Sequence, residues 1–137
     1  MNNTVSYEVQ IQDGLKLLKV LIVDEAQMGN VIGKAVDQLG HKVAVADCYK
    51  EALQKIAETN FDLILWDINL SNGNGIDLIP EIRKSVGKVN IIAMTGYSNR
   101  EIEQRVRVLG VIYFMIKPFE LDELRSIINH HAKRKIK

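Results

Sequence analysis

The sequence is poor in cysteine, in net charge and in long apolar runs, and each scarcity excludes a class of protein. The single cysteine, Cys48, has no partner for an internal disulfide, so we expect a partly buried residue in a reducing cytoplasm. Eighteen basic and 17 acidic residues leave a net charge of +1, too little to draw nucleic acid or anionic lipid. No run approaches the roughly 18 apolar residues of a membrane span, and no basic segment precedes an apolar core near residue 1. We therefore expect a cytoplasmic protein that binds neither membrane nor nucleic acid.

What the chain does contain is an alternation of short apolar runs with helical patterns. With 137 residues, 47% of them hydrophobic, it can bury a core of its own. Between the runs, apolar residues recur at three- and four-residue intervals, as on one face of a helix. The predicted strands are residues 20–23, 43–46, 63–66, 91–94 and 111–116. This alternation predicts an α/β fold with a doubly wound, five-stranded parallel sheet.

The first 18 residues do not follow this alternation. Apolar residues alternate there with polar ones and a hairpin-type dipeptide follows, namely Val5, Tyr7, Val9, Ile11 and Asp13-Gly14. We predict an N-terminal extension over residues 1–18, either an extra strand or a loose tail, before a main domain at 19–133. The basic end at 134–137 continues the run HHAKRKIK, which is typical of a solvated helix terminus.

Polar residues of a few types follow the predicted strands at their carboxyl ends. In strand order they are Asp24-Glu25, Asp67, Thr95 and Lys117-Pro118. Ligands of open α/β sheets bind outside the carboxyl ends of the strands. Carboxylates that converge there need raised pKa values or a cation, and oxygen ligands without His or Cys indicate Mg²⁺ or a similar ion. A lysine and a hydroxyl nearby suit a phosphoryl group.

Four segments resemble, in order and spacing, the signature segments of bacterial response regulator receiver domains: VLIVDE, LILWDINLSNGNG, IIAMTG and YFMIKPF. The resemblance covers residues 18–133. It implies a flavodoxin-like sheet of order 2-1-3-4-5 and a cis Lys117-Pro118 bond. It also implies that a histidine kinase, a phosphotransfer protein or a small phosphodonor transfers a phosphoryl group to Asp67.

The resemblance gives each residue of this edge a role. Asp67 would be the nucleophilic phosphoacceptor. Mg²⁺ or Mn²⁺ would neutralise phosphoryl oxygens and would be held by four groups, namely Asp24, Glu25, Asp67 and the backbone carbonyl of Asn69. Lys117 would reach the phosphoryl oxygens as a point charge, whereas the Thr95 hydroxyl would bind phosphate only when phosphate is present.

Three positions depart from the usual residues of the family. Glu25 stands where Asp is common, which lengthens one proposed metal ligand by a methylene. Ser71 stands where Pro is common, and Asn74 where an acid is common. None of these changes removes the chemistry.

The fifth predicted strand bears on signal output. Its aromatic position is Phe114, which would act with Thr95 as a switch, although ordinary core packing is the alternative. The apolar Val111, Ile112 and Tyr113 predict that the fourth helix, fifth strand and fifth helix form a face for a partner, an output domain on another segment or a second copy. Local burial is the alternative.

Two residues bear on the lifetime of a phosphoryl group. Asn69 lies two positions after Asp67, and Tyr97 two positions after Thr95, places that flank the path of attacking water in the family. We expect the bulk of Tyr97 to slow self-dephosphorylation. Strand alternation turns Trp66 away from the site, so it is expected in the core.

Three functional hypotheses remain. The favoured one is a phosphorylation-controlled signalling module, a switch rather than an enzyme, with no output domain in these residues. The second is a receiver-like module that takes no phosphate and binds partners constitutively. The third is a phosphohydrolase of the haloacid dehalogenase type. Such enzymes use a general acid two residues after the nucleophile, where this sequence has Asn69.

Overall fold

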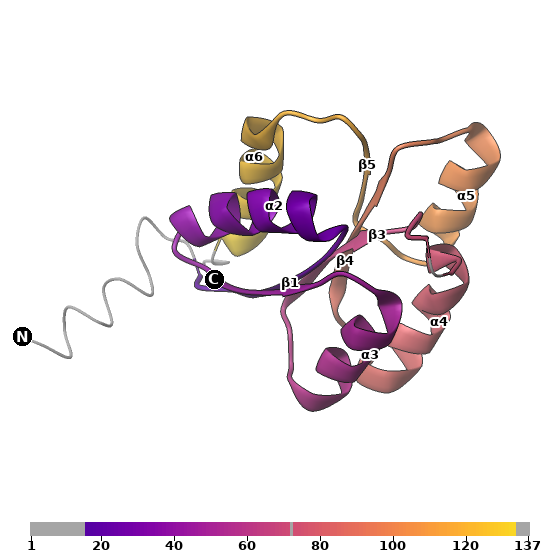
Figure 1. The fold of residues 1–137 in the computed structure, drawn as a ribbon, viewed down its shortest axis with the longest axis horizontal. Coiled ribbons are helices and arrows are strands. Elements are labelled where there is room, and N and C mark those ends of the chain that lie inside the picture. The colour runs from indigo at the N-terminus through magenta and orange to yellow at the C-terminus, as the bar shows by residue number, and fades with distance from the viewer. Residues whose placement is uncertain (1–15, 72, 134–137) are drawn as a thin grey trace, which may run out of the picture.

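The computed structural model describes residues 16–71 and 73–133, and it shows a sheet with helices on both faces (Figure 1). The strands are β1 (Lys19–Val23), β2 (Lys42–Ala46), β3 (Leu63–Asp67), β4 (Asn90–Thr95) and β5 (Tyr113–Ile116). The helices are α2 (Ala26–Gln38), α3 (Tyr49–Glu58), α4 (Gly75–Val86), α5 (Arg100–Val108) and α6 (Leu121–Ala132). The predicted extension lies outside the described residues except for 16–18, so the division into segments stays a prediction.

All four strand pairings are parallel, and the order is β2-β1-β3-β4-β5. The predicted α/β fold and its strand order are therefore confirmed. In this register Val23 lies opposite Trp66, and Asp67 lies opposite Met94. The carboxyl ends of β1, β3 and β4 consequently meet at one edge, where the polar residues of the sequence motifs follow.

Each face of the sheet is covered by its own set of helices (Figure 1). The apolar residues of α2 and α6 pack on one face, against Ile22, Leu65 and Met94. Those of α3, α4 and α5 pack on the other, against residues of the same strands that point the opposite way, such as Ile64 and Trp66. Strands buried on both faces explain why the sequence shows continuous apolar runs rather than alternation.

The central and edge strands differ in burial. Every residue of β3 is buried, and in β1 and β4 only the first residue is exposed. In β2 and β5 most residues are partly or fully exposed. The site residues at the carboxyl ends of β1, β3 and β4 thus belong to the most deeply buried part of the sheet.

The main boundary error concerns the fifth strand, which begins at Tyr113 and not at residue 111. Gly110 adopts a left-handed φ of 83° to leave α5, and Ile112 N–H donates to Ile91 O at 2.8 Å before the ladder begins. Val111 and Ile112 are apolar because they pack on the two opposite cores of the domain. Local burial, the alternative hypothesis, therefore accounts for both residues.

Asparagine side chains mark the starts of two helices. Asn74 Oδ1 accepts from Ile76 N–H at 3.0 Å, and Asn99 Oδ1 accepts from Ile102 N–H at 2.9 Å. Such caps satisfy backbone donors that have no partner within the helix. Asn74, where the family commonly has an acid, thus starts α4. Among residues 16–71 and 73–133, no helix is long and apolar enough to cross a membrane.

Candidate functional site

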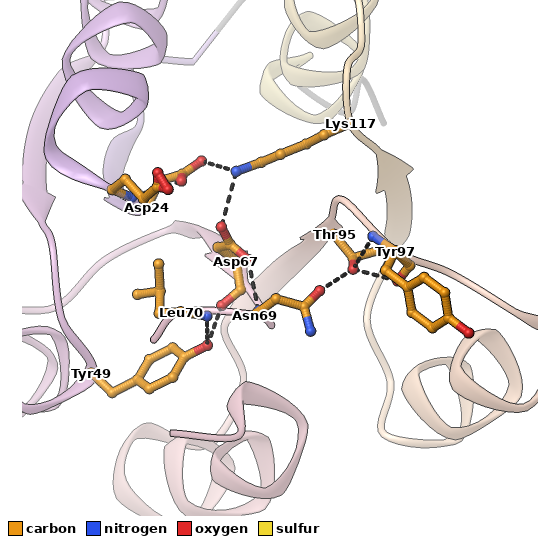
Figure 2. Close-up of polar contacts among 9 residues, drawn as sticks. Asp24, Tyr49, Asp67, Asn69, Leu70, Thr95, Tyr97 and Lys117 are labelled. Carbon is orange, nitrogen blue, oxygen red and sulfur yellow. Dashed lines mark hydrogen bonds and ion pairs between the residues drawn. The ribbon is translucent and has the colours of Figure 1, made fainter. Parts of the chain in front are cut away.

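A lysine joins two buried aspartates at the carboxyl edge of the sheet (Figure 2). Lys117 follows β5, and its Nζ lies 2.6 Å from Asp24 Oδ2 and 2.9 Å from Asp67 Oδ2. Both aspartate side chains are almost completely buried, with 0% and 7% of their surface exposed, whereas that of Lys117 is 20% exposed. The structure therefore brings together three residues that are far apart in the sequence. The Lys117-Pro118 bond is cis, as expected.

The remaining oxygen of each aspartate accepts from a backbone N–H one or two positions further along the chain. Asp24 Oδ1 accepts from Glu25 N–H at 2.7 Å, and Asp67 Oδ1 accepts from Asn69 N–H at 2.7 Å. Hydrogen bonds from backbone and ammonium donors hold both carboxylates in one orientation. The other oxygen of each carboxylate, Oδ2, contacts the Lys117 ammonium, the place where an incoming anion would need a positive charge.

Burial and the shared ion pair together set the pKa values at this edge. It raises the pKa of Asp24 above that of an ordinary aspartate, against the opposing effect of the Lys117 ammonium, and nearby Asp67 adds to the rise. Burial alone would lower the pKa of Lys117, but its hydrogen bonds to Asp24 and Asp67 outweigh it, so that the pKa is raised. The lysine is thus held as a cation between two acids.

Thr95 ends β4, and its hydroxyl contacts Asn69 and Tyr97 (Figure 2). It lies within hydrogen-bonding distance of Asn69 Oδ1 and of Tyr97 O, the latter at 2.6 Å, and it accepts from Tyr97 N–H at 3.0 Å. Among the described residues it has no hydrogen bond to Asp67 or Lys117. The Thr95 hydroxyl is therefore engaged by its neighbours Asn69 and Tyr97. The Thr95 backbone does contact Lys117, since Lys117 N–H donates to Thr95 O at 2.7 Å.

The other predicted residues surround this group. Asn69 is exposed, and Tyr97 exposes 67% of its surface while its backbone contacts Thr95. Phe114 is half-buried and packs on the core that α3, α4 and α5 cover. Trp66 is fully buried, which confirms its predicted place in the core.

Glu25 differs from the expectation that three acids converge. It is exposed and stands at the start of α2, where its side chain makes no capping hydrogen bond. In the described ranges, only Asp47, Cys48 and Glu51 bring three His, Cys, Asp or Glu ligand atoms within 4.8 Å of one another. The carboxylates of Asp24, Glu25 and Asp67 are therefore spread more widely than that. The buried carboxylates of Asp24 and Asp67 therefore form the centre of the site, and Glu25 lies outside this pair.

The residues present fit a hard divalent cation. Asp24 and Asp67 supply oxygen donors, and their two negative charges exceed the one charge of Lys117. Burial makes the charged form of Asp24 costly, and a nearby cation would stabilise that charged form. The donor set suits Mg²⁺ better than a softer metal, because neither His nor Cys is among it.

The sequence patterns did not reveal one further residue of the site. The Tyr49 hydroxyl, which comes from α3, donates to Asp67 O at 2.7 Å and accepts from Leu70 N–H at 3.0 Å. Its ring stacks on Trp66. In the structure, Cβ atoms added at Gly73 and Gly75 would meet the Tyr49 side chain, a fit that the sequence alone does not indicate.

Comparison with known proteins agrees with this geometry. The family model described as response regulator receiver domain matches residues 20–129. The transcriptional regulatory protein MalR of Bacillus subtilis is 26% identical over 121 residues, which cover 86% of this chain and 52% of MalR. Sporulation initiation phosphotransferase F of the same organism is 26% identical over 119 residues, covering 85% and 95% of the two chains. Several relatives are longer, and this chain spans 25% of the Escherichia coli regulator ZraR.

Solved structures show the same fold. A CheY-like receiver domain protein from Methanospirillum hungatei has a TM-score of 0.79 at 26% identity, with 85% of this chain and 94% of that chain covered. The non-phosphorylated HemR receiver domain from Leptospira biflexa has a TM-score of 0.79 at 25% identity, with 87% and 97% covered. The family match over most of the chain, the strand order and the acid-lysine edge agree, and the chain belongs to the response regulator receiver domain family of two-component signalling.

Proposed function

We propose that this chain is a phosphorylation-controlled switch in which Asp67 accepts a phosphoryl group from a histidine kinase or a phosphotransfer protein. The observation that carries the proposal is the bridge from Lys117 Nζ to Asp67 Oδ2 and Asp24 Oδ2. It places a cation beside a buried carboxylate at the sheet edge where ligands of this fold class bind. The relative named as a phosphotransferase, almost all of whose length this chain covers, supports a place in a relay.

In the proposed reaction an Asp67 carboxylate oxygen attacks the phosphorus atom of the donor. A bond from oxygen to phosphorus forms, the bond from phosphorus to the donor atom breaks, and the donor keeps that electron pair. Lys117 changes partner from the Asp67 carboxylate to the phosphoryl oxygens while it remains beside Asp24. Thr95 leaves its local acceptors and donates to the phosphoryl group.

Asp24, Glu25, Asp67 and the carbonyl of Asn69 are the proposed ligands of Mg²⁺. When bound, the ion supplies positive charge that offsets the charge of the phosphoryl oxygens. Asp24 is the ligand best supported, because it is buried, has a raised pKa and lies beside Lys117. Glu25 is exposed and would have to turn toward the edge.

Output would pass to a partner through α5, β5 and α6. Tyr113 exposes 38% and Ile116 55% of their surface on β5, which supports a docking face there. A downstream protein, an output domain on another segment or a second copy of the chain would bind it. The solved NtrC4 receiver domain, described as a beryllofluoride-activated dimer, supports the second copy.

Intact-mass spectrometry after incubation with acetyl phosphate tests this function. We expect one phosphoryl adduct that needs Mg²⁺, that is lost in Asp67→Asn, and that persists in Asp47→Asn, a matched loss of an exposed acid after β2. No adduct from the folded protein under any condition would overturn the proposal and favour a constitutive interaction module. Steady hydrolysis of a small phosphate ester would instead indicate a phosphohydrolase.

A further inference from the structure

The buried side of the Asp67 segment is held by an aromatic residue of a neighbouring helix. Tyr49 is the first residue of α3 and is only 3% exposed. Its hydroxyl donates to Asp67 O at 2.7 Å and accepts from Leu70 N–H at 3.0 Å (Figure 2). One hydroxyl therefore fixes the backbone on both sides of Asn69, using both its donor and an acceptor site.

Trp66 supports this contact from within the core. Its ring stacks on that of Tyr49, with centroids 5.0 Å apart and planes 25° from parallel. Its Nε1–H donates to Gly75 O at 2.9 Å, at the start of α4. Tyr49 and Trp66 together, here called the aromatic clamp, thus hold both the end of β3 and the start of the next helix.

The fit around the clamp is close. A Cβ on Gly75 would lie 2.5 Å from the Tyr49 hydroxyl and 2.6 Å from Ile68 Cα, so only glycine can occupy that position without a shift. A Cβ on Gly73 would lie 3.3 Å from Tyr49 Cδ2. Interiors packed this closely transmit small displacements instead of absorbing them.

Burial also fixes the chemical state of the hydroxyl. It raises the pKa of Tyr49 to about 12, and the nearby Asp67 and Asp24 charges add to that rise. Tyr49 therefore stays neutral at any physiological pH and keeps its proton. Such a group can donate to the Asp67 carbonyl, which suits a structural anchor.

We propose that Tyr49 is a positioning residue of the phosphoacceptor site, acting through the backbone on both sides of Asn69. Asn69 N–H donates to Asp67 Oδ1 at 2.7 Å, so the placement of that backbone sets the orientation of the reacting carboxylate. The same backbone carries the Asn69 carbonyl that is a proposed metal ligand. This inference rests on the function proposed above, because positioning matters only if Asp67 reacts.

The variant Tyr49→Phe removes the hydroxyl and keeps the stacked ring. Ile56→Val is its matched control, because Ile56 is a buried residue of the same α3 and its truncation weakens the core without touching Asp67. We expect the Asn69 and Leu70 amides of Tyr49→Phe to exchange with solvent about fivefold or more faster than those of Ile56→Val, a change typical of one lost hydrogen bond. This exchange is measured without metal or phosphodonor.

The same pair of variants is then compared in phosphoryl uptake from acetyl phosphate over a range of Mg²⁺ concentrations. We expect Tyr49→Phe to raise the half-saturating Mg²⁺ concentration about fivefold relative to Ile56→Val, since the carbonyl ligand is less well placed. Equal exchange rates and equal uptake in the two variants would overturn the inference. Absence of uptake in the wild type would instead overturn the function, so the two failures are distinguishable.

Discussion

The two sides of the carboxyl edge are built differently. On the side of β1 and β3, Asp24 directly follows β1 and Asp67 ends β3. Both strands are buried over most or all of their length, and the two aspartates share one lysine without any ligand. On the side of β4 and β5, the Thr95 hydroxyl is engaged with Asn69 and Tyr97, and β5 is largely exposed. In the proposed function the first side accepts the phosphoryl group, whereas groups of the second side move to contact it.

This difference suggests a division of labour. A charged centre gains from rigid support, because preorganised charges need no rearrangement when the reaction occurs. A reporting element gains from a second arrangement that the ligand favours. We infer that the ends of β1 and β3 serve the chemistry, and that Thr95 at the end of β4 and the exposed edge strand β5 serve the response.

Removal of Lys117 is expected to have the largest effect of all on the side of β1 and β3. In Lys117→Ala two buried carboxylates lose their shared cation, and the phosphoryl oxygens lose a donor. We expect phosphoryl uptake to fall about 100-fold or more. The measurement is the rate of adduct formation with saturating Mg²⁺, with the exposed Lys34→Ala of α2 as the control. A rate within about threefold of the wild type would contradict the role of Lys117.

Asp24→Asn is expected to have opposite effects on stability and on uptake. The folded-state pKa of Asp24 is raised above the ordinary value of 3.8, mainly by burial, so folding is more favourable when Asp24 is protonated than when it is ionised. The stabilisation from protonation is complete below that value and is lost as the pH rises through the raised pKa. The always-neutral variant should therefore unfold a few degrees higher than the wild type near pH 7, while losing metal-dependent uptake.

The pH series sharpens this prediction. Thermal unfolding followed by circular dichroism should show the stability gap between Asp24→Asn and the wild type closing as the pH falls toward 3.8. A gap that widens on acidification would mean that ionised Asp24 stabilises the fold.

Thr95→Ala should affect only the side of β4 and β5, where the response is expected. The backbone N–H and C=O of Tyr97 lose the Thr95 hydroxyl as a partner. This loss should lower the free energy of unfolding by about 1 kcal/mol. We expect uptake within about threefold of the wild type but no change in the amide signals of β5 when phosphoryl is bound. Thr95→Ser, which keeps a hydroxyl, is the control. Normal β5 changes in Thr95→Ala would contradict the role of Thr95 as the reporter.

The smallest effect is expected from Tyr97→Ala. The ring is 67% exposed, so it shields the site from water only partly. Its removal should shorten the phosphoryl lifetime by a factor on the order of two. The decay of the adduct after removal of the donor measures it. An unchanged lifetime would leave the Tyr97 side chain without a role there.

The sequence was informative where local pattern decides the structure. Apolar runs ended by Asp24, Asp67 and Thr95 located the strand ends, because a parallel sheet buries its strands on both faces. The same logic failed at Val111 and Ile112, which are apolar for packing outside the ladder. Continuous apolar character does not separate a strand from a buried connection.

Two features of the site depend on tertiary packing and have no local signature. The exposed position of Glu25 follows from its place at the start of α2, while the adjacent Asp24 is buried. The reach of Tyr49 to Asp67 and Leu70 depends on how α3 sits against β3. No spacing within α3 indicates which backbone a helix residue will contact across the core.

A crystal structure with Mg²⁺ and beryllofluoride bound at Asp67 would test the difference between the two sides most directly, since beryllofluoride stands in for a phosphoryl group. We predict that the β1 and β3 backbone and the Asp24 carboxylate keep their places. Thr95 Oγ1 should have left Asn69 Oδ1 and Tyr97 O to contact the beryllofluoride. A structure in which Thr95 keeps both local contacts, while β1 and β3 rearrange, would contradict the account.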